Sequence, residues 1–87
     1  MPESKERFQK ELDELRRVRD ELKLRIHLAK AEAKDGWDKL EHQFHRLETK
    51  ARQISQASEE PLRDVRDAAR LLINEIRDGY RRIREAL

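Results

Sequence analysis

Residues 8–54 read FQKELDELRRVRDELKLRIHLAKAEAKDGWDKLEHQFHRLETKARQI, and an apolar residue recurs every three or four positions along this stretch. The average spacing is about 3.5 residues, which is the repeat of helices that pack along one another in a left-handed coiled coil. Residues 62–87 repeat with nearly the same period. The pattern therefore predicts helices that lie against other helices. The apolar positions are Phe8, Leu12, Leu15, Val18, Leu22, Ile26, Ala29, Ala33, Trp37, Leu40, Phe44, Leu47, Ala51 and Ile54, followed by Leu62, Val65, Ala69, Leu72, Ile76, Tyr80, Ile83 and Leu87.

The composition indicates an all-α protein. Charged residues make up 46% of the chain, and it contains only two Gly and two Pro, a balance typical of long solvated helices. Disordered chains are also highly charged, but they lack a regular apolar period. We therefore expect one α-helical coiled-coil domain over residues 1–87.

A reversal of the chain is predicted between residues 55 and 61. Ser58 is a residue type that caps a helix N-terminus, and Pro61 removes an N–H group that only the first turn of a helix can spare. These signals predict a short helix over about residues 59–86. A kinked continuous rod is the alternative at this site, because Ile54 and Val65 stay nearly in phase.

The dipeptide Asp35-Gly36 is a second turn signal. The apolar stripe passes through it in phase, from Ala33 to Trp37, and a single Gly costs a helix only about 1 kcal/mol. We therefore predict one continuous long helix over about residues 3–56. A monomeric three-helix bundle with a turn at 35–36 is the alternative.

Together the two helices predict an antiparallel hairpin. A reversal near residues 57–58 pairs residues whose numbers add up to about 117, so that Trp37 meets Tyr80, and Gly79 leaves space for the Trp37 indole. Large residues then face small ones at several layers, as interdigitated packing requires. The predicted hairpin core consists of Trp37, Leu40, Phe44, Leu47, Ile54, Leu62, Val65, Leu72, Ile76 and Tyr80.

The short helix is predicted to run out opposite Ala29, which leaves the N-terminal part of the long helix without a neighbour in its own chain. A hairpin of this size also buries too little apolar area to fold alone. We therefore expect a homodimer or a tetramer with antiparallel long helices. Leu24, Leu28 and Ala31 form a second, smaller apolar patch roughly opposite the main stripe. The predicted oligomer interface consists of Phe8, Leu12, Leu15, Val18, Leu22 and Ile26.

Residues that could carry chemistry are few. His42 and His45 have a spacing that places two imidazoles on neighbouring helical positions, but His42 projects away from the stripe, and a metal site needs further ligands. We interpret both as surface residues. No nucleophile constellation or Gly-rich anion loop is present in the sequence. We therefore predict no catalytic residue, no metal, no cofactor and no small-molecule substrate.

The charge pattern argues against strong binding to polyanions. The net charge is +2, and the arginines of the two basic clusters, 16–19 and 77–84, alternate with acidic residues that repel phosphates. Weak nucleic-acid binding is therefore a second alternative, and peripheral binding to a membrane surface through amphipathic helices is the first. The sequence has no Cys and no run of apolar residues that could span a bilayer. We expect a cytoplasmic protein.

The stretch from Leu22 to Asp35, followed by Trp37, and the stretch from Leu71 to Tyr80 resemble small bacterial α-helical coiled-coil proteins that are uncharacterised. In that family a polar helix former commonly stands in the place of Gly36, which favours a continuous first helix. The resemblance implies no activity. From the residues we predict a non-enzymatic, self-associating scaffold or protein-interaction module, whose partner is itself and, in addition, another protein.

Overall fold

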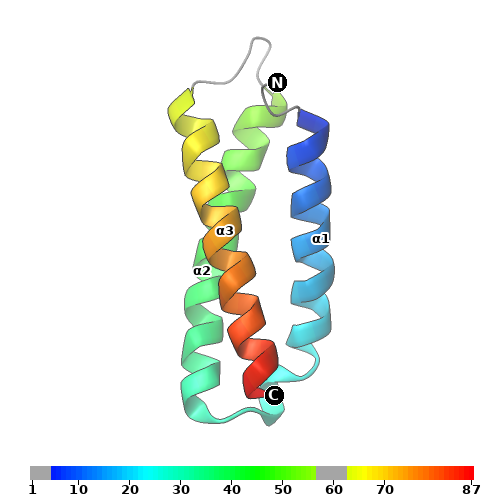
Figure 1. The fold of residues 1–87 in the computed structure, drawn as a ribbon, viewed down its shortest axis with the longest axis vertical. Helices are drawn as coiled ribbons and strands as arrows, with labels where there is room; N and C mark the ends of the chain where they lie inside the picture. The colour runs from blue at the N-terminus through cyan, green and yellow to red at the C-terminus, as the bar shows by residue number, and fades with distance from the viewer. Residues whose placement is uncertain (1–4, 57–62) are drawn as a thin grey trace.

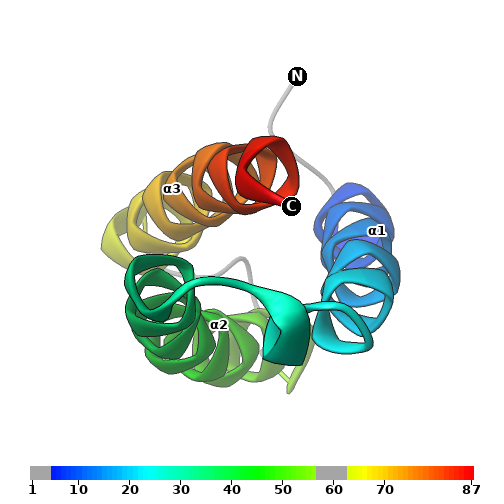
Figure 2. The ribbon, with the colours of Figure 1, turned by 90° about the horizontal axis from the view of Figure 1, so that it is seen from below.

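Three α-helices make up the computed structural model, which describes residues 5–56 and 63–87. They are α1 (Lys5–Lys23), α2 (Ala31–Gln56) and α3 (Arg63–Ala86), and they form a bundle that measures 45 × 20 × 18 Å (Figure 1). The described ranges contain no β-strand, so the all-α prediction is confirmed. Seen along the bundle axis, the three helices lie at the corners of a triangle (Figure 2).

The connector, residues 24–30, corrects the predicted long helix over 3–56. α1 ends at Lys23, one 3₁₀ turn covers Ile26–Leu28, and the chain then reverses into α2. The Arg25 N–H donates a hydrogen bond to the Leu22 carbonyl at 2.9 Å, which closes the first part of the turn. The alternative, a three-helix bundle, has the correct number of helices, but its turn at 35–36 is wrong, because Gly36 lies inside α2.

The connector contains no Gly or Pro, so no local signal marks it as a turn. The reversal has a long-range cause instead: it allows the apolar stripe of α1 to pack on α2 and α3 of the same chain. Tertiary packing of an apolar face supplies most of the stability of protein helices and routinely overrides local propensity.

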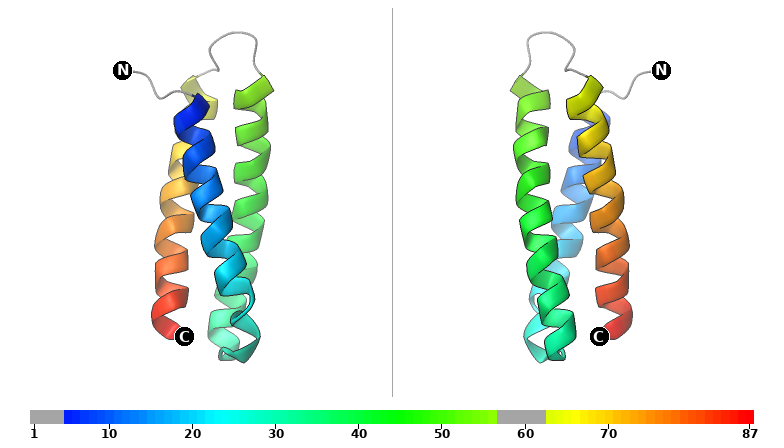
Figure 3. Two further views of the ribbon diagram at one scale, coloured as in Figure 1. Left: turned by 90° about the vertical axis from the view of Figure 1, so that its right-hand side faces the viewer. Right: turned by 90° about the vertical axis from the view of Figure 1, so that its left-hand side faces the viewer.

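The predicted reversal near residues 55–61 falls on residues 57–62, which lie outside the described residues, and so do Ser58, Pro61 and Leu62. On either side of this segment, α2 ends at Gln56 and α3 begins at Arg63. The two helices run side by side in opposite directions, as both views of Figure 3 show.

The interface between α2 and α3 is the most extensive in the bundle. Across it, the Trp37 and Tyr80 rings lie with their centroids 5.8 Å apart, and Gln43 Nε2 donates a hydrogen bond to Glu75 at 3.0 Å. The residue numbers of these pairs add up to 117 and 118, which is consistent with the predicted antiparallel register. Val65 is partly buried. The buried members of the predicted hairpin core are Trp37, Leu40, Phe44, Leu47, Ile54, Leu72, Ile76 and Tyr80.

At Gly79, α3 packs closely against the Leu40 side chain of α2. A Cβ atom at this position would overlap Leu40 Cδ2 and would lie 3.0 Å from Leu40 Cδ1, so only Gly fits without a shift. The space that the sequence assigned to the Trp37 indole is therefore filled by Leu40. Trp37 packs against the Tyr80 ring instead.

Candidate functional site

The predicted oligomer interface lies inside the bundle. Its residues are covered by α2 and α3 of the same chain, because the reversal at 24–30 brings α1 back onto them. The expectation that this stripe lacks an intramolecular neighbour is therefore corrected. Phe8, Leu12, Leu15 and Leu22 are buried in the common core, and Val18 and Ile26 are partly buried against it.

Arg19 fastens α1 to α2. Its guanidinium donates two hydrogen bonds to the Glu41 carboxylate, both of 2.7 Å, and lies 5.1 Å from the centre of the Phe44 ring. The hydrogen bond from Arg19 holds the pKa of Glu41 below its ordinary value, and the same bond raises the pKa of Arg19. Both charges are thus compensated at the edge of the core.

Arg70 fastens α3 to α1 in the same way. It donates a hydrogen bond of 2.6 Å to Glu11 and lies 5.2 Å from the centre of the Phe8 ring. In both clusters the Phe and the Glu are three positions apart on one helix, so a single arginine from the neighbouring helix reaches both. Sequence reasoning missed these clusters, although the spacings Phe8 to Glu11 and Glu41 to Phe44 were a usable signal.

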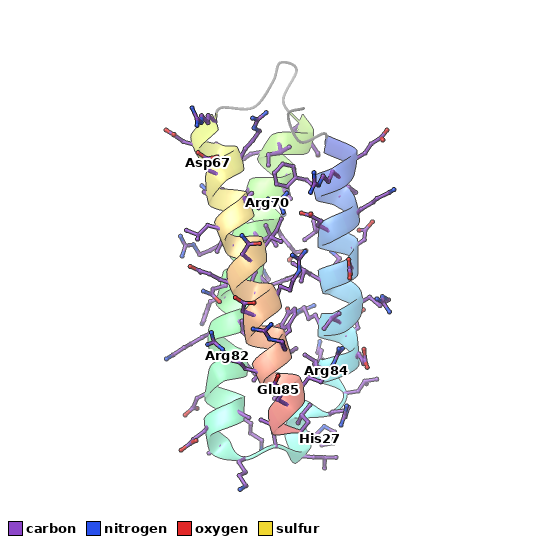
Figure 4. All side chains as sticks on the ribbon, viewed as in Figure 1. His27, Asp67, Arg70, Arg82, Arg84 and Glu85 are labelled. Atoms are coloured by element: carbon purple, nitrogen blue, oxygen red, sulfur yellow. The ribbon has the colours of Figure 1, made fainter. Side chains whose placement is uncertain are left out.

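Two more ion pairs connect α1 with the rest of the bundle. Arg16 lies 3.1 Å from Glu48 on α2, and Arg84 on α3 lies 3.3 Å from Glu21 on α1. Figure 4 shows Arg70 and Arg84 on α3. Each basic cluster therefore has members that are used within the fold, which reduces the positive charge they offer to a phosphate backbone.

Tyr80 is the one polar group in the described core without a partner. Its side chain is 2% exposed, and its hydroxyl makes no hydrogen bond with any described residue. Burial raises the pKa of this phenol well above its ordinary value of 10. A buried hydroxyl without a hydrogen-bond partner destabilises the fold, because it loses its hydrogen bonds to water on folding.

The histidines lie apart from the core. His42 and His45 are exposed on α2, and His27 is exposed at the connector end of the bundle (Figure 4). His45 Nδ1 lies 3.7 Å from Glu48 Oε1. Among residues 5–56 and 63–87, no group of three or more His, Cys, Asp or Glu side chains is placed to hold a metal ion.

A groove runs between α2 and α3 on the side away from α1. It has a volume of about 710 Å³. Leu40 and Ile83 form its apolar floor with Gly36 and Gly79, and charged residues of both signs line it. A Cβ atom at Gly36 would meet only Ile83 Cδ1, at 3.7 Å, which is ordinary contact. Packing within the chain therefore does not explain this Gly. The charged lining residues are Glu32, Lys39, Glu75, Asp78 and Arg82.

Large apolar side chains are exposed at three described positions. Leu24 and Leu28, on the connector, are 75% and 79% exposed, and Leu71 on α3 is 59% exposed. Single exposed leucines are common on soluble proteins. The predicted second patch on the connector is therefore present at the surface, but it is small.

No family model, curated protein or solved structure matches this chain. None of the helices in the described part of the chain is long and apolar enough to cross a membrane.

Proposed function

We propose that this chain is a non-enzymatic protein-interaction module that associates with a second copy of itself through the groove between α2 and α3. The observation that carries the proposal is the groove itself. α1 fills one side of the α2–α3 pair, and the opposite side is left open with an apolar floor. A helix packed there would complete a four-helix arrangement.

The glycine at position 36 supports the proposal. Gly inside a helix costs about 1 kcal/mol relative to Ala. No described neighbour would clash with a Cβ atom at position 36, so the bundle itself does not need Gly there. A Gly on the floor of a groove lets the backbone of a partner approach closely. The cost of Gly36 is then offset by a contact between two molecules.

The charges around the groove support a second copy as the partner. The groove is lined by the acids Glu32, Glu75 and Asp78 and by the bases Lys39 and Arg82. In a twofold dimer the same patch is present on both sides, so acids of one copy can meet bases of the other. A strongly acidic or strongly basic partner would meet repulsion from part of this lining.

The test is the mass in solution of the Gly36→Arg and Gly36→Ala variants, measured by sedimentation equilibrium. Both substitutions remove the Gly, but only the arginine fills the groove. For protein purified without refolding, we expect wild type to dimerise through the groove, Gly36→Ala to form the same dimer less tightly, and Gly36→Arg to form a particle of about half the mass. Equal masses for all three proteins, or a wild type that is monomeric at high concentration, would reject the groove as the interface.

A further inference from the structure

Part of the connector backbone is near-helical. Arg25 has φ −107° and ψ −18°, at the edge of the right-handed helical region, and Ile26–Leu28 is a 3₁₀ turn. Ala29 is extended, with φ −82° and ψ 163°. No described residue has a positive φ. The ψ angle of Ala29 is therefore one angle that must change for the connector to become continuous helix.

The residue types of the connector also favour a helix. Ala is the best helix former of all, Leu, Arg and Lys are good ones, and the connector has no Gly, Pro or Asn to prefer a turn. Moreover, Ile26 and Ala29 continue the apolar stripe in phase from Leu22 to Ala33. The reversal is therefore maintained by the packing of α1 on α2 and α3, and the connector does not enforce it.

The contacts that hold α1 do not depend on which molecule supplies them. Its buried side chains pack against α2 and α3, and the four interhelical ion pairs that α1 makes with other described residues end on the same two helices. A second copy offers the same surface. The pairs are Arg16–Glu48 and Arg19–Glu41 with α2, and Glu11–Arg70 and Glu21–Arg84 with α3.

We propose that residues 24–30 act as a hinge, and that α1 is exchanged between two copies so that each α1 packs on the α2 and α3 of the other. α1 already lies antiparallel to α2, so two chains with helical connectors reproduce this packing when they run antiparallel about a twofold axis. The numbers of the α1–α2 pairs Arg19–Glu41 and Arg16–Glu48 add up to 60 and 64, so the axis would pass near residues 30–32. This interface does not use the groove between α2 and α3.

The exchange conserves most contacts. The dimer remakes the core contacts and ion pairs of α1 and adds backbone hydrogen bonds across the connector, against the loss of the turn's own hydrogen bonds and the entropy of association. It also makes the whole α1 interface intermolecular, which supplies far more buried area than any exposed patch on the single chain. The balance between the two forms therefore depends on protein concentration.

Ala31→Pro is the decisive variant. Ala31 is the first residue of α2, where Pro is well tolerated because its N–H has no partner within the helix. In a continuous helix the same Pro would sit in the interior, remove a hydrogen bond and clash with the preceding turn. Ala31→Pro thus keeps the bundle and blocks the exchange, whereas Ala31→Ser changes the same position without blocking it.

The experiment uses the Gly36→Arg background, in which the groove is closed, after refolding at high protein concentration. We expect a dimer with Gly36→Arg alone and with added Ala31→Ser, and a monomer with added Ala31→Pro, whose dimer should be at least about a hundredfold weaker. The melting temperature of the Ala31→Pro monomer should match that of the dilute parent.

Two outcomes would overturn the exchange. A dimer that persists with Ala31→Pro would place the contact elsewhere on the surface, and a Gly36→Arg protein that is monomeric at all concentrations would exclude a second interface. Neither outcome bears on the groove, which is tested by comparing the masses in solution of wild type and Gly36→Arg.

As a reciprocal test, deletion of residues 24–30 leaves no room for a reversal and should give an obligate dimer. A folded monomer of this deletion would also reject the exchange.

Discussion

Arg19 and Glu41 join α1 to α2 by two hydrogen bonds of 2.7 Å, and the same guanidinium stacks on Phe44. One side chain thus makes a bidentate ion pair and an aromatic contact between two helices. A lysine has one ammonium group and cannot reproduce this geometry. The pair is only partly exposed, at 22% for Arg19 and 25% for Glu41, so water screens it less than a surface ion pair.

We expect Arg19→Ala to lower the free energy of unfolding by about 1–2 kcal/mol, because it removes the ion pair and the contact with Phe44. Arg19→Lys should recover less than half of this loss. Arg16→Ala is the matched control, since Arg16 is 44% exposed and its pair with Glu48 should contribute less than about 0.5 kcal/mol. Urea unfolding of the three variants measures these free energies. Equal losses for Arg16→Ala and Arg19→Ala would contradict the prediction.

The pKa of Glu41 predicts a loss of stability in acid. Its pKa is lower in the fold than its ordinary value of 4.5, because Arg19 donates hydrogen bonds to the carboxylate. The stabilisation is therefore complete above about pH 4.5 and is lost as the pH falls through the lower pKa of the folded state. Thermal melts between pH 7 and pH 2 should show a smaller acid-induced decrease for Glu41→Gln than for wild type. Parallel curves would show that Glu41 is not responsible.

Tyr80→Phe should stabilise the bundle by about 1 kcal/mol, since it removes a buried hydroxyl without a partner and keeps the ring against Trp37. The raised pKa of Tyr80 adds a second expectation. The fold favours the neutral phenol over the ionised form, so wild type keeps its full stability below pH 10 and loses stability as the pH rises above that value. Alkaline melts should therefore separate wild type from Tyr80→Phe, and a variant less stable than wild type at pH 7 would refute the assignment.

The two glycines should respond to alanine in opposite directions. At Gly79 the new methyl group would overlap Leu40, whose side chain is held in the core, so we expect a loss of about 1–3 kcal/mol. At Gly36 the methyl group meets Ile83 at an ordinary distance, and the helix gains about 0.5–1 kcal/mol. Chemical unfolding of both variants at low concentration provides the comparison. A loss at Gly36 would mean that α2 does not tolerate a side chain there.

The α2–α3 pair was predictable because its register follows from the spacing of apolar residues. Trp37 and Tyr80 are the clearest example. The break after Lys23 was not predictable, because no residue near it favours a turn and the apolar period continues through it. The reversal is selected only by the free energy gained when residues such as Phe8 and Leu22 are buried within one chain. That gain depends on the packing of all three helices, so local sequence patterns cannot predict it.

The candidate site, too, could be predicted only in part. Sequence spacing assigned Leu24 and Leu28 to a second apolar patch, and both are exposed in the structure. The groove around Gly36 could not be predicted, because it exists only where α1 leaves one face of the α2–α3 pair uncovered. The sequence did contain a turn dipeptide there, which proved to be helical.

The packing of α1 has a consequence for the order of events during translation. Translation produces α1 before Arg70 and Arg84, the residues that fasten α1 to α3. The nascent chain therefore carries an amphipathic helix whose contacts with α3 are missing until α3 emerges. Neighbouring ribosomes on one messenger hold such helices at high local concentration, and this is the setting in which two chains would first meet.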